Sequence, residues 1–244
     1  MRVATFNIRH GAEEAGSRFW GDPGAVAEAC QELNADIIAL QEVDRRTVRS
    51  RFQDMAALAA SALGVNCVFA PTMRMLGGHY GNALLFRGEL VEGYPPLELE
   101  GGYRYKVNAL GRAWDIKHEP RNAILARLHI GGVALSVAST HLSKERTFAM
   151  QQLPRVLDAL SALPGPHVLL GDLNTPYAAV KNIDIPDGFG FAKVPAGIPA
   201  SAPRRAIDHI AVNGFGVSSI EAMHMPISDH RAIIAEIQPS TSNY

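Results

Sequence analysis

Polar side chains able to hold a cation or move a proton stand beside short apolar runs at six places in this sequence. Apolar runs of this length are typical of strands that are buried on both faces. A buried polar group costs free energy unless it is paired, so a hydrophobic core alone does not call for such residues. Six of them in one chain predict a functional site. They are Asn7, Gln41-Glu42, Thr140-His141, Asp172 with Asn174, Asp208, and Asp229-His230.

Three of these side chains are candidate metal ligands. Glu42 and Asp229 offer carboxylates, and Asn7 offers an amide oxygen. Two carboxylates with water suit Mg²⁺, which keeps much of its hydration and favours phosphate oxygens, and Mn²⁺ is the alternative ion. Zinc is disfavoured, because no thiolate cluster and no histidine pair at helical spacing accompany them. Taken alone, Glu42 is better explained as a surface or capping carboxylate, and the prediction depends on the whole set.

The remaining polar residues are candidates for catalysis. His141 and His230 can stabilise charge on a phosphoryl oxygen or pass a proton, although a single histidine at a strand end is more often structural. Asp208 is a candidate to orient His230, as a carboxylate does in a catalytic triad. Asp172 and Asn174 are two residues apart, so on an extended segment both point to one side. We expect one to accept a proton from water and the other to donate to a phosphate.

Strand and helix patterns alternate along the chain without a dividing linker, which predicts a single domain over residues 1–244. Asp22-Pro23 predicts a helix start, and Phe52 to Leu63 predicts a second helix that stops at Gly64. Residues 123–139 predict a hairpin turning at Gly131-Gly132. A third helix is expected from Ser143 toward Leu163, with a kink or restart at Pro154. The last three strands are expected near 207–212, 217–222 and 231–237, while residues 88–120 and 174–203 are expected to be largely irregular.

The positions of the polar groups constrain the direction of the strands. Most of them follow their strands, whereas Asp229-His230 precede the last one. All can meet at one edge only if that last strand runs antiparallel to the others. The sequence therefore favours two packed mixed sheets with helices outside them over a parallel doubly wound fold.

Charge and cysteine content narrow the choice of substrate and compartment. The net charge is −1, from 23 basic and 24 acidic residues, whereas proteins that grip long nucleic acids usually have a basic surplus. A local basic patch that binds phosphates is an alternative, because Arg45, Arg46, Arg49 and Arg51 follow Glu42 and Arg204-Arg205 precede Asp208. Solvated surface arginines explain these clusters equally well. Two cysteines, no apolar run long enough to cross a bilayer and a strand-like start at Met1 lead us to expect a cytoplasmic protein.

The ordered set of motifs resembles the endonuclease–exonuclease–phosphatase superfamily, which has the fold of deoxyribonuclease I. The resemblance covers about residues 2–237, and its motifs are specific as a set although weak singly. The matching segments are Thr5-Phe6-Asn7-Ile8, Gln41-Glu42-Val43-Asp44, Gly81-Asn82-Ala83, Ser139-Thr140-His141-Leu142, Gly171-Asp172-Leu173-Asn174, Ile207-Asp208-His209 and Ser228-Asp229-His230.

This resemblance implies a four-layer α/β-sandwich and metal-dependent phosphoester hydrolysis. It implies that Glu42 binds Mg²⁺ with Asn7 and Asp229 nearby, and that Asp172 aligns the attacking water. It further implies that Asn174 contacts phosphate and that Asp208 and His230 form a pair. Asn82 and Arg121 are assigned to the substrate, the latter only by its approximate position. His141 matches a second histidine that abasic-site endonucleases of the superfamily lack.

The expected activity is hydrolysis of a compact phosphodiester, sugar phosphate or lipid headgroup by a monomeric enzyme. About 36 residues separate Asp172 from Asp208, which leaves no room there for long DNA-gripping insertions. A nuclease acting on DNA or RNA is the alternative. A catalytically inactive scaffold is the third possibility, and it is disfavoured because the motif residues are all present.

Overall fold

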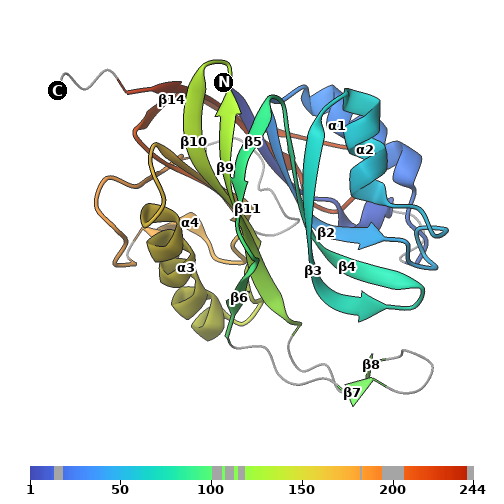
Figure 1. Cartoon of the computed structure of the whole chain (residues 1–244). Coiled ribbons are helices and arrows are strands. Elements are labelled where there is room, and N and C mark those ends of the chain that lie inside the picture. Colours follow the sequence, from blue (N-terminus) through green and yellow to red (C-terminus); the bar gives the residue numbers. More distant parts are fainter. Residues whose placement is uncertain are drawn as a thin grey trace.

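The computed structural model describes residues 1–13, 19–100, 106–107, 113–114, 119–181, 183–193 and 206–240. Two mixed β-sheets pack face to face, with helices on their outer faces (Figure 1). The order of strands in the first sheet is β14 (Phe215–Met223), β15 (Ala232–Pro239), β1 (Arg2–Asn7), β2 (Ile37–Arg45), β4 (Gly78–Phe86) and β3 (Asn66–Met75). The order in the second is β12 (Gly190–Phe191), β13 (Asp208–Asn213), β11 (His167–Asp172), β10 (Val133–His141), β9 (Arg121–Ile130) and β5 (Glu89–Gly93), and β6 (Leu97–Leu99) also pairs with β9.

The apolar runs form strands because each sheet is covered on both faces. Along β2, Ile37 and Ala39 face the core between the two sheets, while Ile38 and Leu40 face the core beneath the helices. This alternation follows from the period of two residues in a strand, and it explains why the run contains no polar position. A third core lies between the second sheet and the helix Arg146–Ser161. The expected four-layer α/β-sandwich is confirmed.

The helices begin and end at residues with capping chemistry. α1 (Pro23–Leu33) follows Asp22, whose side chain accepts hydrogen bonds from two backbone N–H groups of the first turn. α2 spans Met55–Leu63 and ends at Gly64, which has a left-handed conformation. The expected start of α2 at Phe52 is wrong, because Asp54 caps the helix and Phe52 belongs to the preceding loop. A 3₁₀ turn, η1 (Arg9–Gly11), follows β1.

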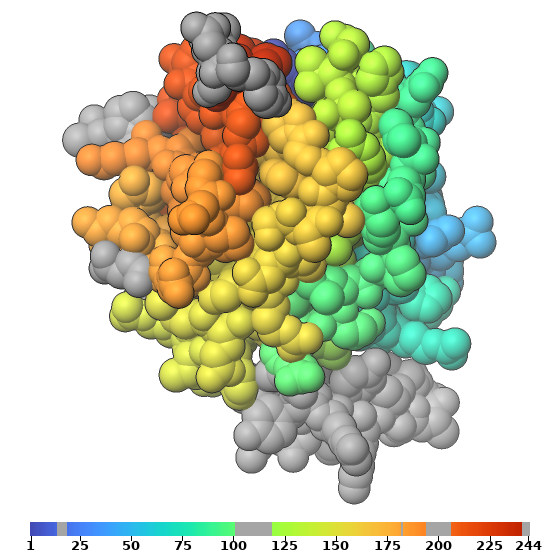
Figure 2. All heavy atoms as spheres, turned by 60° about the vertical axis from the view of Figure 1, so that its left-hand side comes forward, coloured from blue at the N-terminus to red at the C-terminus, as the bar shows by residue number. Residues whose placement is uncertain are grey.

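The helix containing Pro154 does not restart there. α3 is one helix, Arg146–Ser161, with Pro154 in its interior. Proline removes only one backbone donor, and burial of Leu153, Val156 and Leu157 holds the turns on either side of it. α3 packs on the outer face of the second sheet, and its yellow atoms lie at the surface in Figure 2.

Two regions expected to be irregular contain short elements. β5 and β6 form by pairing with β9, and the remaining short elements are β7 (Lys106–Val107), β8 (Ala113–Trp114), α4 (Tyr177–Val180) and β12. β5 is exposed along its whole length, so its sequence shows no alternating pattern and only its neighbour makes it a strand. Arg204-Arg205 lie outside the described residues.

The hairpin and the direction of the last strand are as expected. β9 and β10 pair antiparallel across Gly131-Gly132, both with positive φ. β1 is parallel to β2 but antiparallel to β15, and β11 is parallel to β10 but antiparallel to β13. The ends of β1, β2, β10 and β11 therefore meet the starts of β13 and β15 at one edge of the sandwich. Among the described residues, no helix is both long and apolar enough to cross a membrane.

Candidate active site

The predicted polar residues meet where the two sheets come together. The Asn7 Nδ2 group, at the end of β1, donates hydrogen bonds to Glu42 Oε1 at 3.1 Å and to Asp172 Oδ2 at 3.0 Å. Glu42 belongs to the first sheet and Asp172 to the second. The buried Asn7 amide therefore connects a carboxylate of the first sheet to a carboxylate of the second.

The orientation of Asn7 is fixed from both sides. Its Oδ1 accepts a hydrogen bond from the backbone N–H of Arg9 at 3.0 Å, and its backbone carbonyl accepts one from Ser228 Oγ at 2.6 Å. With Oδ1 occupied, the amide presents its nitrogen to the two carboxylates. In this arrangement Asn7 positions Glu42 and Asp172, whereas the sequence suggested a metal ligand.

Glu42 is directed into the site by an irregularity in β2. The pairing of β2 with β4 shifts register between Leu40 and Val43, and Glu42 has φ 60°. A β-bulge places two residues opposite one and turns the side chain out of the usual alternation. Glu42 is consequently partly exposed between buried neighbours. The sequence pattern located Glu42 but gave no sign of the bulge.

Asp172, Asp208 and His230 form a compact cluster. The register of β11 and β13 places Asp172 opposite Asp208, and Asp208 Oδ2 accepts a hydrogen bond from His230 Nδ1 at 2.9 Å. Burial disfavours the charged imidazolium, but the charge and hydrogen bond of Asp208 outweigh it and raise the pKa of His230 to about 9. Burial, and next the neighbouring charge of Asp208, raise the pKa of Asp172 to about 7. The expected Asp208–His230 contact is therefore present, and His230 is a cation at neutral pH.

His141 occupies a different electrostatic environment. Arg121 Nη1 lies 2.9 Å from His141 Nδ1, and because a guanidinium only donates, Nδ1 must accept and the ring proton resides on Nε2. Burial, and next the charge of Arg121, place the pKa of His141 well below its ordinary value. His141 is thus a neutral donor, which can stabilise charge on a phosphoryl oxygen without carrying charge itself. Its Nε2 lies 3.4 Å from Asp172 Oδ2 and, within the described residues, has no hydrogen-bond partner.

Asn174 departs from the extended geometry assumed for it. The strand ends at Asp172, and Asn174 has φ 49°. Its backbone N–H donates to Asp172 Oδ1 at 2.9 Å and its side-chain amide donates to the carbonyl of Leu142 at 2.9 Å. Both interactions hold the Asp172 loop in place. The premise that the two side chains point in parallel is wrong, because the chain turns immediately after β11.

The other assigned residues are also placed by the structure. Asn82 donates to Asn122 Oδ1 at 3.1 Å and so bridges β4 and β9, one from each sheet. Arg121 is buried and donates to Glu119 Oε1 at 3.0 Å as well as to His141. Asp229 is 40% exposed, with Oδ1 3.9 Å from Arg9 Nε.

The sequence assigned no role to two residues at this site, although Ser228 belongs to one of the matching segments. Ser228 has φ 70°, and its hydroxyl binds Asn7 and also accepts from the backbone N–H of His230 at 3.1 Å. It therefore anchors the turn that carries Asp229 and His230, and its place directly before them was the only available signal. Tyr80 is buried, and burial with the charges of Glu42 and Glu119 keeps the pKa of its phenol well above the ordinary value. Nothing in the local pattern around Tyr80 indicated that it lies near these groups.

Two overlapping groups of residues could hold a cation. Glu42 and Asp172 both lie within hydrogen-bond distance of one amide nitrogen, and Asp172, Asp208 and His230 present ligand atoms within 4.8 Å of one another. The raised pKa of Asp172 reflects buried carboxylates whose negative charge is only partly balanced by His230. A divalent cation beside oxygen donors relieves such repulsion, so the residues fit a hard cation. His230 Nδ1 is already hydrogen-bonded to Asp208 and is not available as a ligand. The group formed by Glu42 and Asp172 is therefore the better place for the ion.

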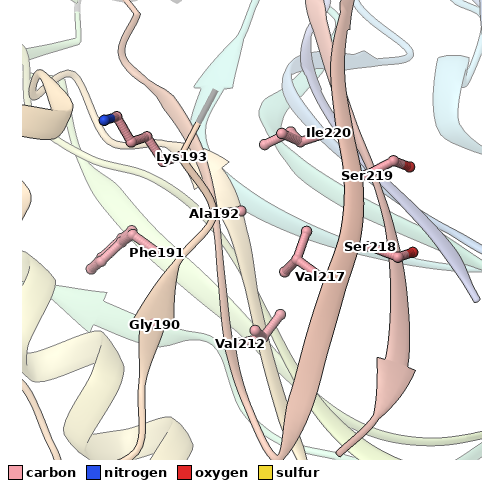
Figure 3. A pocket seen from close by; sticks show the side chains of 9 residues that line it. All are labelled: Gly190, Phe191, Ala192, Lys193, Val212, Val217, Ser218, Ser219 and Ile220. Atoms are coloured by element: carbon pink, nitrogen blue, oxygen red, sulfur yellow. The ribbon is translucent and has the colours of Figure 1, made fainter. Parts of the chain in front are cut away.

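A separate cavity of about 410 Å³ lies between the edge strands of the two sheets (Figure 3). Phe191, Val212, Val217 and Ile220 line it, with Lys193 at its rim. None of the catalytic candidates contributes to it. The chemistry of the chain is therefore concentrated at the strand ends and not in this cavity.

Solved structures with the same fold have low sequence identity to this chain. A protein described as endonuclease/exonuclease/phosphatase from Beutenbergia cavernae DSM 12333 has a TM-score of 0.74 at 19% identity, over 98% of this chain and 71% of that one. The endonuclease/exonuclease/phosphatase from Bacteroides vulgatus has a TM-score of 0.72 at 20% identity, over 98% of both chains. Mannosyl-6-phosphatase Bt3783 from Bacteroides thetaiotaomicron VPI-5482 has a TM-score of 0.69 at 16% identity, over 98% of this chain and 99% of that one. No curated protein sequence matches significantly.

The family model described as Endonuclease/Exonuclease/phosphatase family matches residues 4–230. This range includes every strand-end residue of the site, from Asn7 to His230. The match spans nearly the whole chain and agrees with the two-sheet architecture. The chain therefore belongs to the endonuclease/exonuclease/phosphatase family.

Proposed function

We propose that this protein hydrolyses a phosphoester bond in a compact substrate, using a divalent cation, Mg²⁺ or Mn²⁺, and in-line attack of water. One observation carries the proposal. The buried Nε2–H of His141, which has no hydrogen-bond partner in the described part of the chain, and the cationic His230 converge on Asp172, at 3.4 Å and 4.0 Å from its Oδ2. Two donors and one carboxylate around the same point are what a phosphoryl group and an attacking water require.

The residues divide the work according to their protonation states. Asp172 aligns the water and takes its proton as the water oxygen bonds to phosphorus. His230, kept protonated by Asp208, stabilises charge on the phosphoryl group and can protonate the leaving oxygen as its bond to phosphorus breaks. His141 donates from Nε2 to a phosphoryl oxygen without carrying charge.

The cation belongs beside Glu42, with Asp229 and the Asn7 amide at the same edge of the sandwich. When bound, it would neutralise charge that develops on the phosphoryl oxygens. Asn7 holds Glu42 toward that position, and Ser228 fixes the turn that carries Asp229. These contacts exist within the protein, so the carboxylates are positioned before a cation arrives.

A compact substrate is favoured by the charges that surround the site. Arg49 is paired bidentately with Asp44 and Arg45 is paired with Asp54, so these two of the four arginines after Glu42 are not free to follow a nucleic acid backbone. Net charge is −1. A phosphodiester, sugar phosphate or lipid headgroup needs only the metal, the two histidines and Arg121 around it. The neighbour named mannosyl-6-phosphatase is consistent with a small phosphoester.

Nuclease activity is the second candidate, since Arg46 and Arg51 are exposed just beyond the site. Affinity for a polynucleotide would then fall steeply with salt, because each neutralised phosphate releases a counterion. We further propose that the protein acts in the cytoplasm as a monomer. Both cysteines, Cys30 and Cys67, are free thiols, as is usual in a reducing compartment.

The test is a panel of small phosphomonoesters and phosphodiesters, assayed with Mg²⁺ and Mn²⁺ beside plasmid DNA at near-physiological salt. We expect hydrolysis of at least one small ester to exceed nicking of the plasmid. Efficient nicking with every small ester left intact would replace this proposal with the nuclease. No metal-dependent hydrolysis of any of these substrates, by a protein with intact folding, would contradict both.

A further inference from the structure

Two large apolar side chains stand exposed beside each other at the end of the first sheet. Phe52 is 63% exposed in the loop after β2, and Leu76 is 58% exposed in the turn between β3 and β4. The loop and the turn are in contact, because Val48 N–H donates to the carbonyl of Leu76 at 2.9 Å and the Phe52 ring packs over Gly77. Figure 1 shows the β3–β4 hairpin projecting beside the loop that follows β2.

Three exposed arginines surround this apolar pair. Arg46 and Arg51 lie in the same loop as Phe52, and Arg74 lies two residues before Leu76. Within the described residues none of the three forms an ion pair, and residues 46–53 and 72–79 contain no Asp or Glu. We name this group of five residues, Arg46, Arg51, Phe52, Arg74 and Leu76, the hairpin-tip surface.

The loop holds its shape against unfavourable backbone geometry. Arg46, Arg51 and Phe52 all have positive φ, at 58°, 53° and 59°. Such conformations persist in residues other than glycine only when the surroundings enforce them. Here buried Asp44 binds both Thr47 and Arg49, and Ser50 donates to the carbonyl of Gln53. Polar contacts inside the loop therefore hold Phe52 and two arginines in exposed positions.

The distribution of charge favours an anionic bilayer over a polynucleotide as the partner of this surface. A polynucleotide running from the site to the tip would need unpaired cations along its path, but Arg45 and Arg49, which lie between, are paired with Asp54 and Asp44. A base could stack on Phe52, whereas Leu76 offers no flat ring. A bilayer with anionic headgroups accepts both apolar side chains and places its phosphates beside the arginines. The pattern of apolar centre and cationic rim fits that surface.

We propose that the hairpin-tip surface docks this protein onto an anionic lipid bilayer, with Phe52 and Leu76 in the headgroup region and the three arginines on lipid phosphates. The loop begins four residues after Glu42, and β4 runs from the tip back to Asn82. Docking therefore brings the site edge of the sandwich toward the membrane. The inference does not require the proposed hydrolase activity, because binding can be measured without turnover.

The test is co-sedimentation of the full chain with vesicles of phosphatidylcholine, with and without phosphatidylglycerol. We expect binding to the anionic vesicles that salt weakens. Phe52→Asn with Leu76→Ser should lower it by about tenfold or more, because asparagine tolerates the left-handed backbone while both apolar groups are lost. Replacing Arg46, Arg51 and Arg74 by glutamine should lower it on the order of 100-fold.

The matched control is Leu90→Ser with Val91→Ser, which removes two exposed apolar side chains from β5 in the other sheet. This variant should bind like the wild type, and circular dichroism should show that all variants are folded. The proposal would be overturned if binding did not depend on phosphatidylglycerol or if the tip variants bound like the wild type. It would also be overturned if the control variant lost as much binding as the tip variants. Absence of vesicle binding would also overturn it. In that case, weaker binding of single-stranded oligothymidylate by the tip variants would identify the surface as a nucleic acid site.

Discussion

Replacing Asp208 with asparagine should destabilise the fold at acidic pH and have little effect at alkaline pH. Asp208 Oδ2 accepts the hydrogen bond from His230 Nδ1 at 2.9 Å, and both side chains are largely buried. Burial by itself disfavours the His230 cation, and Asp208 reverses this, so that the pKa of His230 reaches about 9. Asparagine keeps the shape of the side chain and removes its charge.

The size of the effect follows from the two pKa values. The folded pKa of about 9 lies above the ordinary histidine value of 6.5, and each pKa unit corresponds to about 1.4 kcal/mol, giving an upper figure of about 3 kcal/mol. Because the folded pKa is the higher one, this stabilisation is fully present below pH 6.5 and disappears as pH rises through about 9. Asp172 also makes the stability loss of the variant smaller at alkaline pH. Burial, and next the charge of Asp208, raise the pKa of Asp172 to about 7, so at alkaline pH the variant is relieved of a repulsion between two carboxylates.

The assay is urea unfolding of wild type and Asp208→Asn in EDTA at several pH values, together with NMR titration of His230. Asp158→Asn is the matched control, since Asp158 is exposed on α3 and its carboxylate has no hydrogen bond or ion pair with any residue that the structure describes. We expect a loss of unfolding free energy near pH 6 that shrinks or reverses near pH 10. An equal loss at both pH values, or an unchanged His230 pKa in the variant, would refute the electrostatic account.

Three further outcomes are expected. Glu42→Gln should raise the Mg²⁺ concentration needed for turnover and remove most activity while leaving the fold intact, and unchanged metal dependence would contradict its assignment. In ¹⁵N NMR at neutral pH, His141 should carry its proton on Nε2, and Arg121→Met should raise its pKa by removing a neighbouring charge; a protonated Nδ1 in the wild type would disprove the tautomer. Thiol reagents should modify exposed Cys67 but not Cys30, whose pKa burial raises to about 12, and labelling of both thiols in the folded protein would contradict this burial.

Local sequence determined the elements and the approximate place of the site. The apolar run before Glu42 forms a strand because both of its faces are covered, and Asp22 begins a helix because its side chain caps the first turn. The requirement that Asp229 and His230 join the other polar groups was enough to predict the antiparallel last strand. These inferences depend on properties that a short segment carries with it, namely period, capping chemistry and the direction of the chain.

Only the tertiary structure decided what each polar group does. The bulge that directs Glu42 outward arises from the pairing of β2 with β4, and the left-handed turn at Asn174 is accommodated by the carbonyl of Leu142. The two histidines look alike in the sequence. His230 is a cation because β13 places Asp208 beside it, and His141 is neutral because β9 places Arg121 beside it. Protonation depends on the charges that distant segments bring together, and a local pattern cannot contain that information.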